Sequence, residues 1–230
     1  MSKIQLHQPS FNFRDMKALN QCIRSGWVSN QGNFVKLFKK KITNFTKSNY
    51  VVPTINGTSA LHMALILANV SKNDEVLVPT ITYVATINPI IYIGAKPVFF
   101  DASDDLNISI KDINNFIKNE TFLKKGSTYN KSTKKKISAI IITHVFGNAV
   151  DLKPILKICK KQNIKIIEDA AESLGTTYQN NYLKNKHTGT LGDFGCLSFN
   201  GNKIITTGGG GAVLMRDKKD YEYCNYLCDQ

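Results

Sequence analysis

The sequence has no long apolar run, since none of its stretches approaches the roughly 20 uninterrupted apolar residues that a membrane-spanning helix needs. Its first residues, Met1-Ser2-Lys3-Ile4-Gln5, also lack the charged and then apolar pattern of a signal peptide. These absences predict a soluble protein that is not exported. We therefore expect it in the cytoplasm, without a membrane partner.

Cysteine and histidine are also sparse. The five cysteines have no C-x-x-C spacing, which argues against a disulfide framework and against a zinc site. Neither His62 nor His187 has plausible metal partners nearby in the sequence. We expect reduced thiols and no metal. The cysteines are Cys22, Cys159, Cys196, Cys224 and Cys228.

Arginine is nearly absent although the formal net charge is +13. Only Arg14, Arg24 and Arg216 are arginine, and the other 27 basic residues are lysine. Because base recognition favours the planar fork of arginine, this composition favours a solvated surface over a nucleic-acid site. A basic nucleic-acid-binding protein stays a remote alternative. Many lysines lie in Lys124–Lys136, a polar segment that we predict to be a solvated loop.

Strand-like and helix-like segments alternate along the chain, which predicts an α/β fold with a mostly parallel sheet flanked by helices. Apolar residues at three- and four-residue spacing predict helices over Asp15–Ser25, Phe34–Thr46, Thr58–Asn69, Ile110–Lys118 and Leu152–Gln162. Apolar, often β-branched runs predict strands over Glu75–Val78, Pro97–Phe100, Ile137–Thr143, Ile164–Glu168, Gly195–Phe199 and Ala212–Met215.

Ligands of such sheets collect at the carboxyl ends of the strands, so polar residues that follow apolar runs are candidates for a site. Gly57, Thr58 and Ser59 open a predicted helix, where free backbone N–H groups and the helix dipole favour a phosphate. An ordinary N-cap by Thr58 or Ser59 explains this segment equally well.

Three further candidates follow predicted strands. Asp169 could pair with a protonated ring nitrogen or could cap a helix. Tyr83 could stack on a flat heterocycle or pack against its neighbours. His144 could face a bound ligand or satisfy a loop carbonyl, and both interpretations stay open.

The segment from Ser198 to Lys203 carries the most chemical information. Its hydroxyl lies five residues before the lysine, in a turn that leaves an apolar strand and precedes the glycines Gly208–Gly211. The hydroxyl can bind a phosphate while the lysine reaches a carbonyl carbon. Pyridoxal phosphate (PLP) carries a phosphate and an aldehyde on different ring substituents. Together with Asp169, Tyr83 and the helix start, the segment predicts a PLP site.

Six motifs of the sequence are highly specific in combination: Ser25–Ser29, Asn56–Leu61, Pro79–Thr86, Glu168–Gly175, Gly192–Lys203 and Thr206–Gly211. Through these motifs the chain resembles the DegT/DnrJ/EryC1/StrS family of PLP-dependent nucleotide-sugar aminotransferases. The resemblance extends over nearly all of its 230 residues.

The resemblance implies the large domain of a type I PLP-dependent transferase. Lys203 would bind the cofactor covalently and move a proton during catalysis, and Asp169 would pair with the ring nitrogen. Tyr83 would stack on the ring and Glu172 would lie near its phenolic oxygen. The implied phosphate-binding residues are Gly57, Thr58, Ser59 and Ser198. Trp27 and His144 are the candidates for substrate contacts.

The resemblance also implies the reaction. Related sugar 3-dehydratases carry histidine at the position of Lys203, so the lysine favours amino transfer. The expected donor is glutamate and the expected acceptor is a nucleotide-linked 4-keto-6-deoxy sugar, for a surface polysaccharide or glycoconjugate. We expect a homodimer. A PLP-type dehydratase or an inactive cofactor-binding homologue is the alternative.

Two features depart from the family pattern. Gly209 stands where many members have glutamate, and the chain stops at Gln230, where members continue for well over a hundred residues. We expect an N-terminal active-site segment over residues 1–30 and a PLP-binding large domain over residues 31–230. The small C-terminal domain is expected to be missing.

Overall fold

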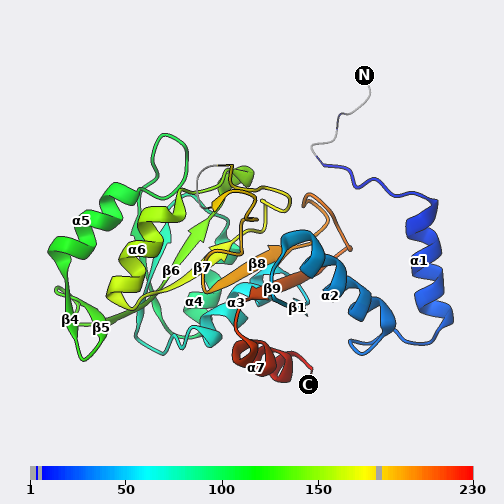
Figure 1. Cartoon of the computed structure of the whole chain (residues 1–230), viewed down its shortest axis with the longest axis horizontal. Helices are drawn as coiled ribbons and strands as arrows, with labels where there is room; N and C mark the ends of the chain where they lie inside the picture. The colour runs from blue at the N-terminus through cyan, green and yellow to red at the C-terminus, as the bar shows by residue number, and fades with distance from the viewer. Residues whose placement is uncertain (1–3, 5–6, 180–182, 230) are drawn as a thin grey trace.

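The structure is a computed structural model that describes residues 4, 7–179 and 183–229. Within these ranges nine strands form one sheet, in which seven follow the order β1-β9-β8-β7-β6-β2-β3 and β5, paired with β4, adds to β6 (Figure 1). The strands are β1 (Tyr50–Thr54), β2 (Glu75–Pro79), β3 (Lys96–Phe100), β4 (Thr121–Lys124), β5 (Ser127–Asn130), β6 (Lys136–Thr143), β7 (Lys165–Asp169), β8 (Phe194–Ser198) and β9 (Gly211–Met215).

Helices cover both faces of this sheet (Figure 1). They are α1 (Phe13–Arg24), α2 (Asn33–Thr46), α3 (Gly57–Leu67), α4 (Asn88–Tyr92), α5 (Ile110–Glu120), α6 (Leu152–Gln162) and α7 (Lys218–Cys228), with two 3₁₀ turns, η1 (Val84–Thr86) and η2 (Val145–Gly147). No helix among the described residues has the length and apolar character needed to cross a membrane.

The direction of the central strands decides where a site can form. β2 pairs in parallel with β3 and β6, β6 with β7, and β7 with β8, whereas β9 runs antiparallel to both β8 and β1. The carboxyl ends of β2, β6, β7 and β8 therefore meet at one edge of the sheet. The expected fold, a mixed and mostly parallel sheet flanked by helices, is confirmed.

Alternation along the central strands builds the two halves of the core. Ile141 and Ile167 face the cluster under α3, while Ile140, Ile142 and Ile166 face the cluster under α5 and α6. All but Ile166 are fully buried. A strand with apolar residues at every position must be covered on both faces, which explains why these isoleucine runs identify the strands of the sheet.

Helix α1 differs from the others because none of its residues is buried. Asn12 and Asp15 form a capping box at its start, so the helix begins where a local signal fixes it. Its apolar side chains, including Phe13 and Ile23, are exposed, and α1 lies to one side of the sheet (Figure 1).

The predicted helices and strands are confirmed with shifts of a few residues at their ends, but the prediction for Lys124–Lys136 is wrong. This segment contains β5, which forms an antiparallel hairpin with β4. Its inward side chains are polar: Thr128 donates to the Gln162 carbonyl at 2.6 Å, and Asn130 donates to Glu75 Oε2 at 2.9 Å. Because the inward positions are not apolar, the alternation typical of a strand is hidden.

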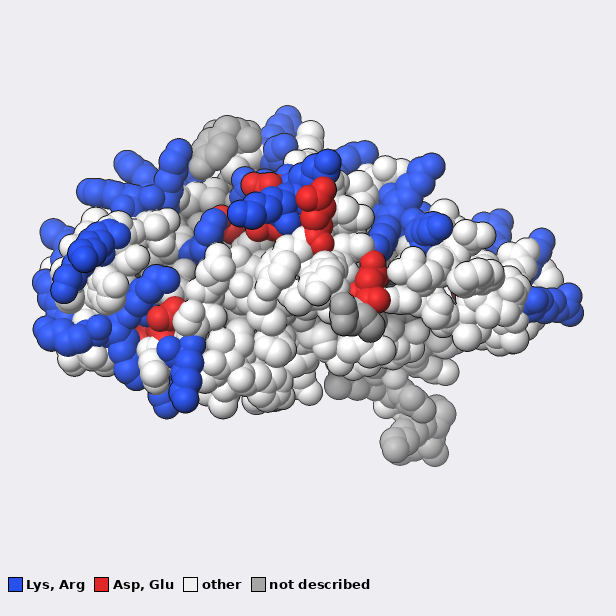
Figure 2. Space-filling model, turned by 90° about the horizontal axis from the view of Figure 1, so that it is seen from below, with Lys and Arg blue, Asp and Glu red and all other residues white. Residues whose placement is uncertain are grey.

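Lysine and arginine side chains spread over the face seen in Figure 2 and crowd at the end formed by α5 and the β4–β5 hairpin. β5 pairs with the first residues of β6, so this basic end lies away from the carboxyl edge of the sheet. The lysines that these elements and the adjoining turns contribute are Lys111, Lys118, Lys124, Lys125, Lys131, Lys134, Lys135 and Lys136.

Replacing Ile141 with alanine tests the core directly. Ile141 is fully buried between β6 and α3, so the cavity should lower the free energy of unfolding by about 2 to 5 kcal/mol. Urea unfolding followed by circular dichroism measures this loss. Ile23→Ala in α1 is the control, because this side chain is 60% exposed and its removal should change stability by less than about 0.5 kcal/mol. Equal effects of the two substitutions would contradict the assigned core.

Candidate active site

The start of α3 lies at the carboxyl edge of the sheet and is held there by close packing. A Cβ atom on Gly57 would stand 2.9 Å from Ser198 Cβ, so only glycine lets the helix start approach the end of β8 this closely. The last glycine of Gly208–Gly211 also lies close to the start of α3, because a Cβ on Gly211 would clash with the Asn56 carbonyl oxygen. Backbone N–H groups of α3 and the Ser198 hydroxyl therefore border the same space.

The N-cap of α3 is Asn56, whose side chain accepts a hydrogen bond from the Ser59 N–H at 2.8 Å. The N-cap alternative for Thr58 or Ser59 is therefore wrong, since both lie inside the first turn. Both side chains are half-buried, and no hydrogen bond of either hydroxyl occurs within the described ranges. Thr58, Ser59 and Ser198 thus offer hydroxyl groups around a helix N-terminus, an arrangement suited to an anion.

Lys203 follows β8 and points its amine toward the end of β7. Its Nζ lies 3.0 Å from Glu172 Oε1, and its side chain is only 12% exposed against 41% for Glu172. A turn closed by the Lys203 N–H on the Asn200 carbonyl sets the position of the lysine. The amine is held in one place by this ion pair, while the carboxylate stays open to solvent on its other side.

Asp169 ends β7 and is 6% exposed. Its Oδ2 accepts the Thr86 hydroxyl at 2.7 Å and its Oδ1 accepts the Ala171 N–H at 3.2 Å. Burial raises the pKa of Asp169, and the hydrogen bonds and the charge of Lys203 oppose this rise only in part. Each carboxylate oxygen keeps acceptor capacity, so Asp169 can receive a further donor or cation.

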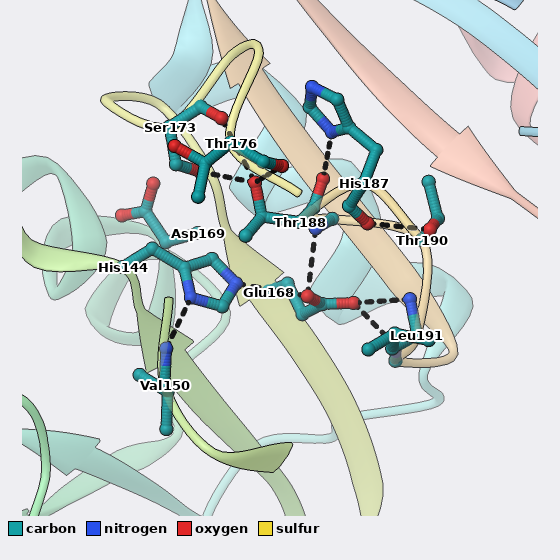
Figure 3. Close-up of polar contacts among 12 residues, drawn as sticks. His144, Val150, Glu168, Asp169, Ser173, Thr176, His187, Thr188, Thr190 and Leu191 are labelled. Atoms are coloured by element: carbon teal, nitrogen blue, oxygen red, sulfur yellow. Dashed lines mark hydrogen bonds and ion pairs between the residues drawn. The ribbon is translucent and has the colours of Figure 1, made fainter. Parts of the chain in front are cut away.

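Glu168, one residue earlier, is fully buried and saturated with donors (Figure 3). Its Oε2 accepts from the Gly189 N–H at 2.8 Å and from His144 Nε2 at 2.9 Å. Its Oε1 accepts from the N–H groups of Leu191 at 2.7 Å and Gly192 at 2.5 Å. Burial alone would raise the pKa of Glu168, but the bonds from His144 and the backbone lower it below its ordinary value.

His144 lies beneath the site and is fully buried (Figure 3). Its Nδ1 accepts the Val150 N–H at 3.2 Å, so the ring proton sits on Nε2 and is donated to Glu168. The expected contact with a loop carbonyl is wrong, because the ring partners are the Glu168 carboxylate and the Val150 N–H. Both ring nitrogens are engaged inside the protein, which makes His144 a support for β7.

Tyr83 and Trp27 are both exposed. Tyr83 precedes η1 at the end of β2 and is 73% exposed, with no ring contact in the described part of the chain. Its ring is therefore not packed against neighbours and has a free face. Trp27 is 59% exposed between α1 and α2, and its backbone forms hydrogen bonds with Cys22 and Ser25; among the described residues, no hydrogen bond or aromatic ring pair joins it to another candidate.

Glu168 and Thr86 are functional candidates that the sequence analysis missed. The adjacent acids at the end of a buried strand were a signal for Glu168, because they point to opposite faces of a sheet that is covered on both faces, so each needs partners inside the protein. Thr86 lies in the motif Pro79–Thr86, but no local pattern links it to Asp169, which is 83 residues away along the chain. Among the described residues, no group of three or more His, Cys, Asp or Glu could hold a metal ion.

The sequence and the fold of this chain are both similar to those of known proteins. A sequence model of the DegT/DnrJ/EryC1/StrS aminotransferase family matches residues 10–230. The GDP-perosamine synthase of Escherichia coli O157:H7 is 37% identical over 231 residues, which cover 100% of this chain and 58% of that protein. This chain therefore spans just over half the length of that relative.

Solved structures show the same fold. A DegT DnrJ EryC1 StrS aminotransferase from Brucella abortus superposes with a TM-score of 0.83 at 28% identity, covering 93% of this chain and 54% of that one. The E. coli GDP-4-keto-6-deoxy-D-mannose-3-dehydratase with bound hydrated PLP has a TM-score of 0.82 at 24% identity, with coverage of 99% and 54%. The second likeness concerns the fold alone.

Replacing Glu168 with glutamine tests how much the buried carboxylate and its four hydrogen bonds stabilise the fold. The amide would turn an NH₂ group toward N–H donors, so unfolding should become easier by about 3 to 5 kcal/mol at neutral pH. Urea unfolding measures the change. Glu222→Gln is the control, because the Lys218–Glu222 pair is largely exposed and contributes less than about 1 kcal/mol.

The stability difference between the wild type and Glu168→Gln should depend on pH. Folding lowers the pKa of Glu168. The contribution of its carboxylate to the free energy of unfolding is therefore complete above the pKa of an unfolded glutamate, about 4.3, and is lost as the pH falls through the lower pKa of the folded state. The stability difference between the wild type and Glu168→Gln should therefore shrink on acidification. A difference that stays constant down to pH 3 would contradict an ionised Glu168.

Proposed function

The chain belongs to the DegT/DnrJ/EryC1/StrS aminotransferase family, and we propose that its carboxyl edge binds PLP for transfer of an amino group to a nucleotide-linked sugar. One observation supports this most. Asp169 and Ser198 end the adjacent strands β7 and β8, Lys203 lies in the turn that follows β8, and Gly57 brings a helix N-terminus against the same edge. PLP needs these functions together: an anion site, a ring-nitrogen partner and an amine.

The residues at this edge fit the three ends of the cofactor. Gly57, Thr58, Ser59 and Ser198 would hold the phosphate, because hydroxyls and a helix N-terminus border one space that a side chain on Gly57 would invade. Asp169 would accept the proton-bearing ring nitrogen with its remaining lone pairs. The free face of Tyr83 would stack on the ring.

Bound PLP would supply an aldehyde for the amino group and a ring that withdraws electrons from the reacting carbon. Lys203 would hold the aldehyde carbon covalently and then, once released, move the proton at the reacting carbon with its Nζ. Glu172 would orient this amine through the 3.0 Å ion pair and would lie near the phenolic oxygen of the ring. Asp169 would keep the ring nitrogen charged by staying ionised.

The relatives favour one class of acceptor. GDP-perosamine synthase carries the name of a GDP-linked amino sugar, so we propose a GDP-linked 4-keto-6-deoxy sugar as acceptor, with glutamate as donor. The amino sugar would serve a surface polysaccharide or glycoconjugate. Lysine at position 203 favours amino transfer over the related dehydratase reaction, in which histidine occupies this position. We propose the cytoplasm as its location, in line with five free thiols.

A homodimer is part of the same proposal. Large apolar side chains are exposed around the carboxyl edge, where a second copy would cover them. They are Ile55, Ile81, Tyr83, Phe146, Ile204 and Ile205. Within this assembly we propose that residues 1–30, including Trp27, act as an active-site segment and that residues 31–230 act as the PLP-binding domain.

Covalent trapping on Lys203 tests the proposed function. The chain is mixed with PLP, reduced with borohydride and digested, and mass spectrometry locates the added cofactor. We expect the adduct on the peptide that contains Lys203, together with a visible absorption before reduction. Lys203→Ala should remove both. In a longer chain that has amino-transfer activity, Lys203→Ala should lower the rate of amino transfer by roughly 100- to 10,000-fold.

Lys219→Ala is the matched control, because Lys219 is exposed on α7 and should leave the adduct unchanged. PLP that binds without an adduct at Lys203, or an adduct that persists in Lys203→Ala, would contradict the proposed role of the lysine.

A further inference from the structure

Three threonine hydroxyls form a chain that ends on Asp169. Thr86 Oγ1 donates to Asp169 Oδ2 at 2.7 Å, Thr82 Oγ1 lies 2.6 Å from Thr86 Oγ1, and Thr143 Oγ1 lies 3.1 Å from Thr82 Oγ1. Thr86 is fully buried and the other two are half-buried. The chain joins the segments that follow β2 to the ends of β6 and β7.

The carboxylate fixes the direction of every bond in this chain. An ionised Asp169 can only accept, so the single proton of the Thr86 hydroxyl points to it. Thr86 then has only lone pairs to offer Thr82, so Thr82 donates to Thr86. By the same reasoning Thr143 donates to Thr82. All three hydroxyl dipoles are aligned toward the carboxylate, and such chains strengthen one another.

We propose that Thr86, supported by Thr82 and Thr143, is a positioning residue that holds the Asp169 carboxylate ionised and fixed for the ring nitrogen of the cofactor. This inference rests on the proposed function. The remaining donor to Asp169 is the Ala171 N–H at the longer distance of 3.2 Å. Thr86 therefore provides the shorter of the two hydrogen bonds that oppose the cost of burying this charge.

Neighbouring Glu168 shows why Asp169 needs such a donor. Glu168 uses backbone N–H groups and His144 to fill its acceptor positions, which leaves no room for a ligand. Asp169 must stay charged while one side remains open. A hydroxyl chain on Oδ2 meets both requirements, because it stabilises the charge from the protein side only.

The first arm of the test uses the protein without cofactor. Carbon-13 NMR of aspartate-labelled protein follows the titration of the Asp169 carboxyl, assigned with Asp169→Asn. Thr86→Val keeps the shape of the side chain but removes the donor, so the pKa of Asp169 should rise by about one to two pH units. Thr86→Ser restores a hydroxyl and should return the wild-type titration. Thr82→Val should raise the pKa by a smaller amount.

The second arm uses bound PLP labelled with nitrogen-15 in its ring. Loss of the Thr86 donor makes Asp169 more basic, so the proton shifts from the ring nitrogen toward the carboxylate. The nitrogen resonance should move toward that of a neutral pyridine in Thr86→Val and return in Thr86→Ser. Thr80→Val is the matched control, because its hydroxyl lies 3.3 Å from the exposed carboxylate of Asp101 and not near Asp169.

Unchanged Asp169 titration in Thr86→Val, or an equal shift in Thr80→Val, would overturn the inference. If Thr86→Val does not fold, as judged by near-ultraviolet circular dichroism, the smaller shift in Thr82→Val decides. If the wild-type chain binds no PLP, the proposed function fails, and the titration without cofactor still decides whether the hydroxyl chain controls Asp169.

Discussion

The buried carboxylate of Glu168 is the interaction on which the site depends. Glu168 is the second-last residue of the central strand β7, and its carboxylate is fully buried and accepts four hydrogen bonds. These bonds fix His144, which directly follows β6, and the backbone of residues 189–192, which precedes β8. One carboxylate thus joins the ends of β6 and β7 to the segment that leads into β8 (Figure 3). Asp169 follows directly, and its place at the edge of the sheet is set by this anchor.

Adjacent carboxylates at the end of β7 have opposite electrostatic surroundings. Successive strand residues point to opposite faces of the sheet, so Glu168 turns toward His144 on one face and Asp169 toward Thr86 on the other. Donors saturate Glu168 and lower its pKa, whereas burial raises the pKa of the less satisfied Asp169. The first carboxylate stabilises the fold. Asp169 keeps lone pairs that can accept a further hydrogen bond, which is the property that a partner for a cationic ring requires.

The sequence predicted the parts of the fold and site that depend on local pattern. Isoleucine runs identified β6 and β7, and residues after the strands identified Asp169 and Lys203 as candidates. It did not predict the β4–β5 hairpin, whose inward positions are polar, nor β1, α4 and α7. The link from Thr86 to Asp169 spans 83 residues, and the saturation of Glu168 needs three loop N–H groups. Such contacts exist only after the chain has folded, so no local pattern encodes them.

A crystal structure of this chain grown with PLP tests the central claim most directly. The account predicts the phosphate within hydrogen-bond distance of Ser198 and the first turn of α3, the ring nitrogen on Asp169, and continuous density from the cofactor to Lys203. The Thr86 hydroxyl should remain on the far side of the same carboxylate. Cofactor density away from the carboxyl edge, or a ring nitrogen turned from Asp169, would contradict it.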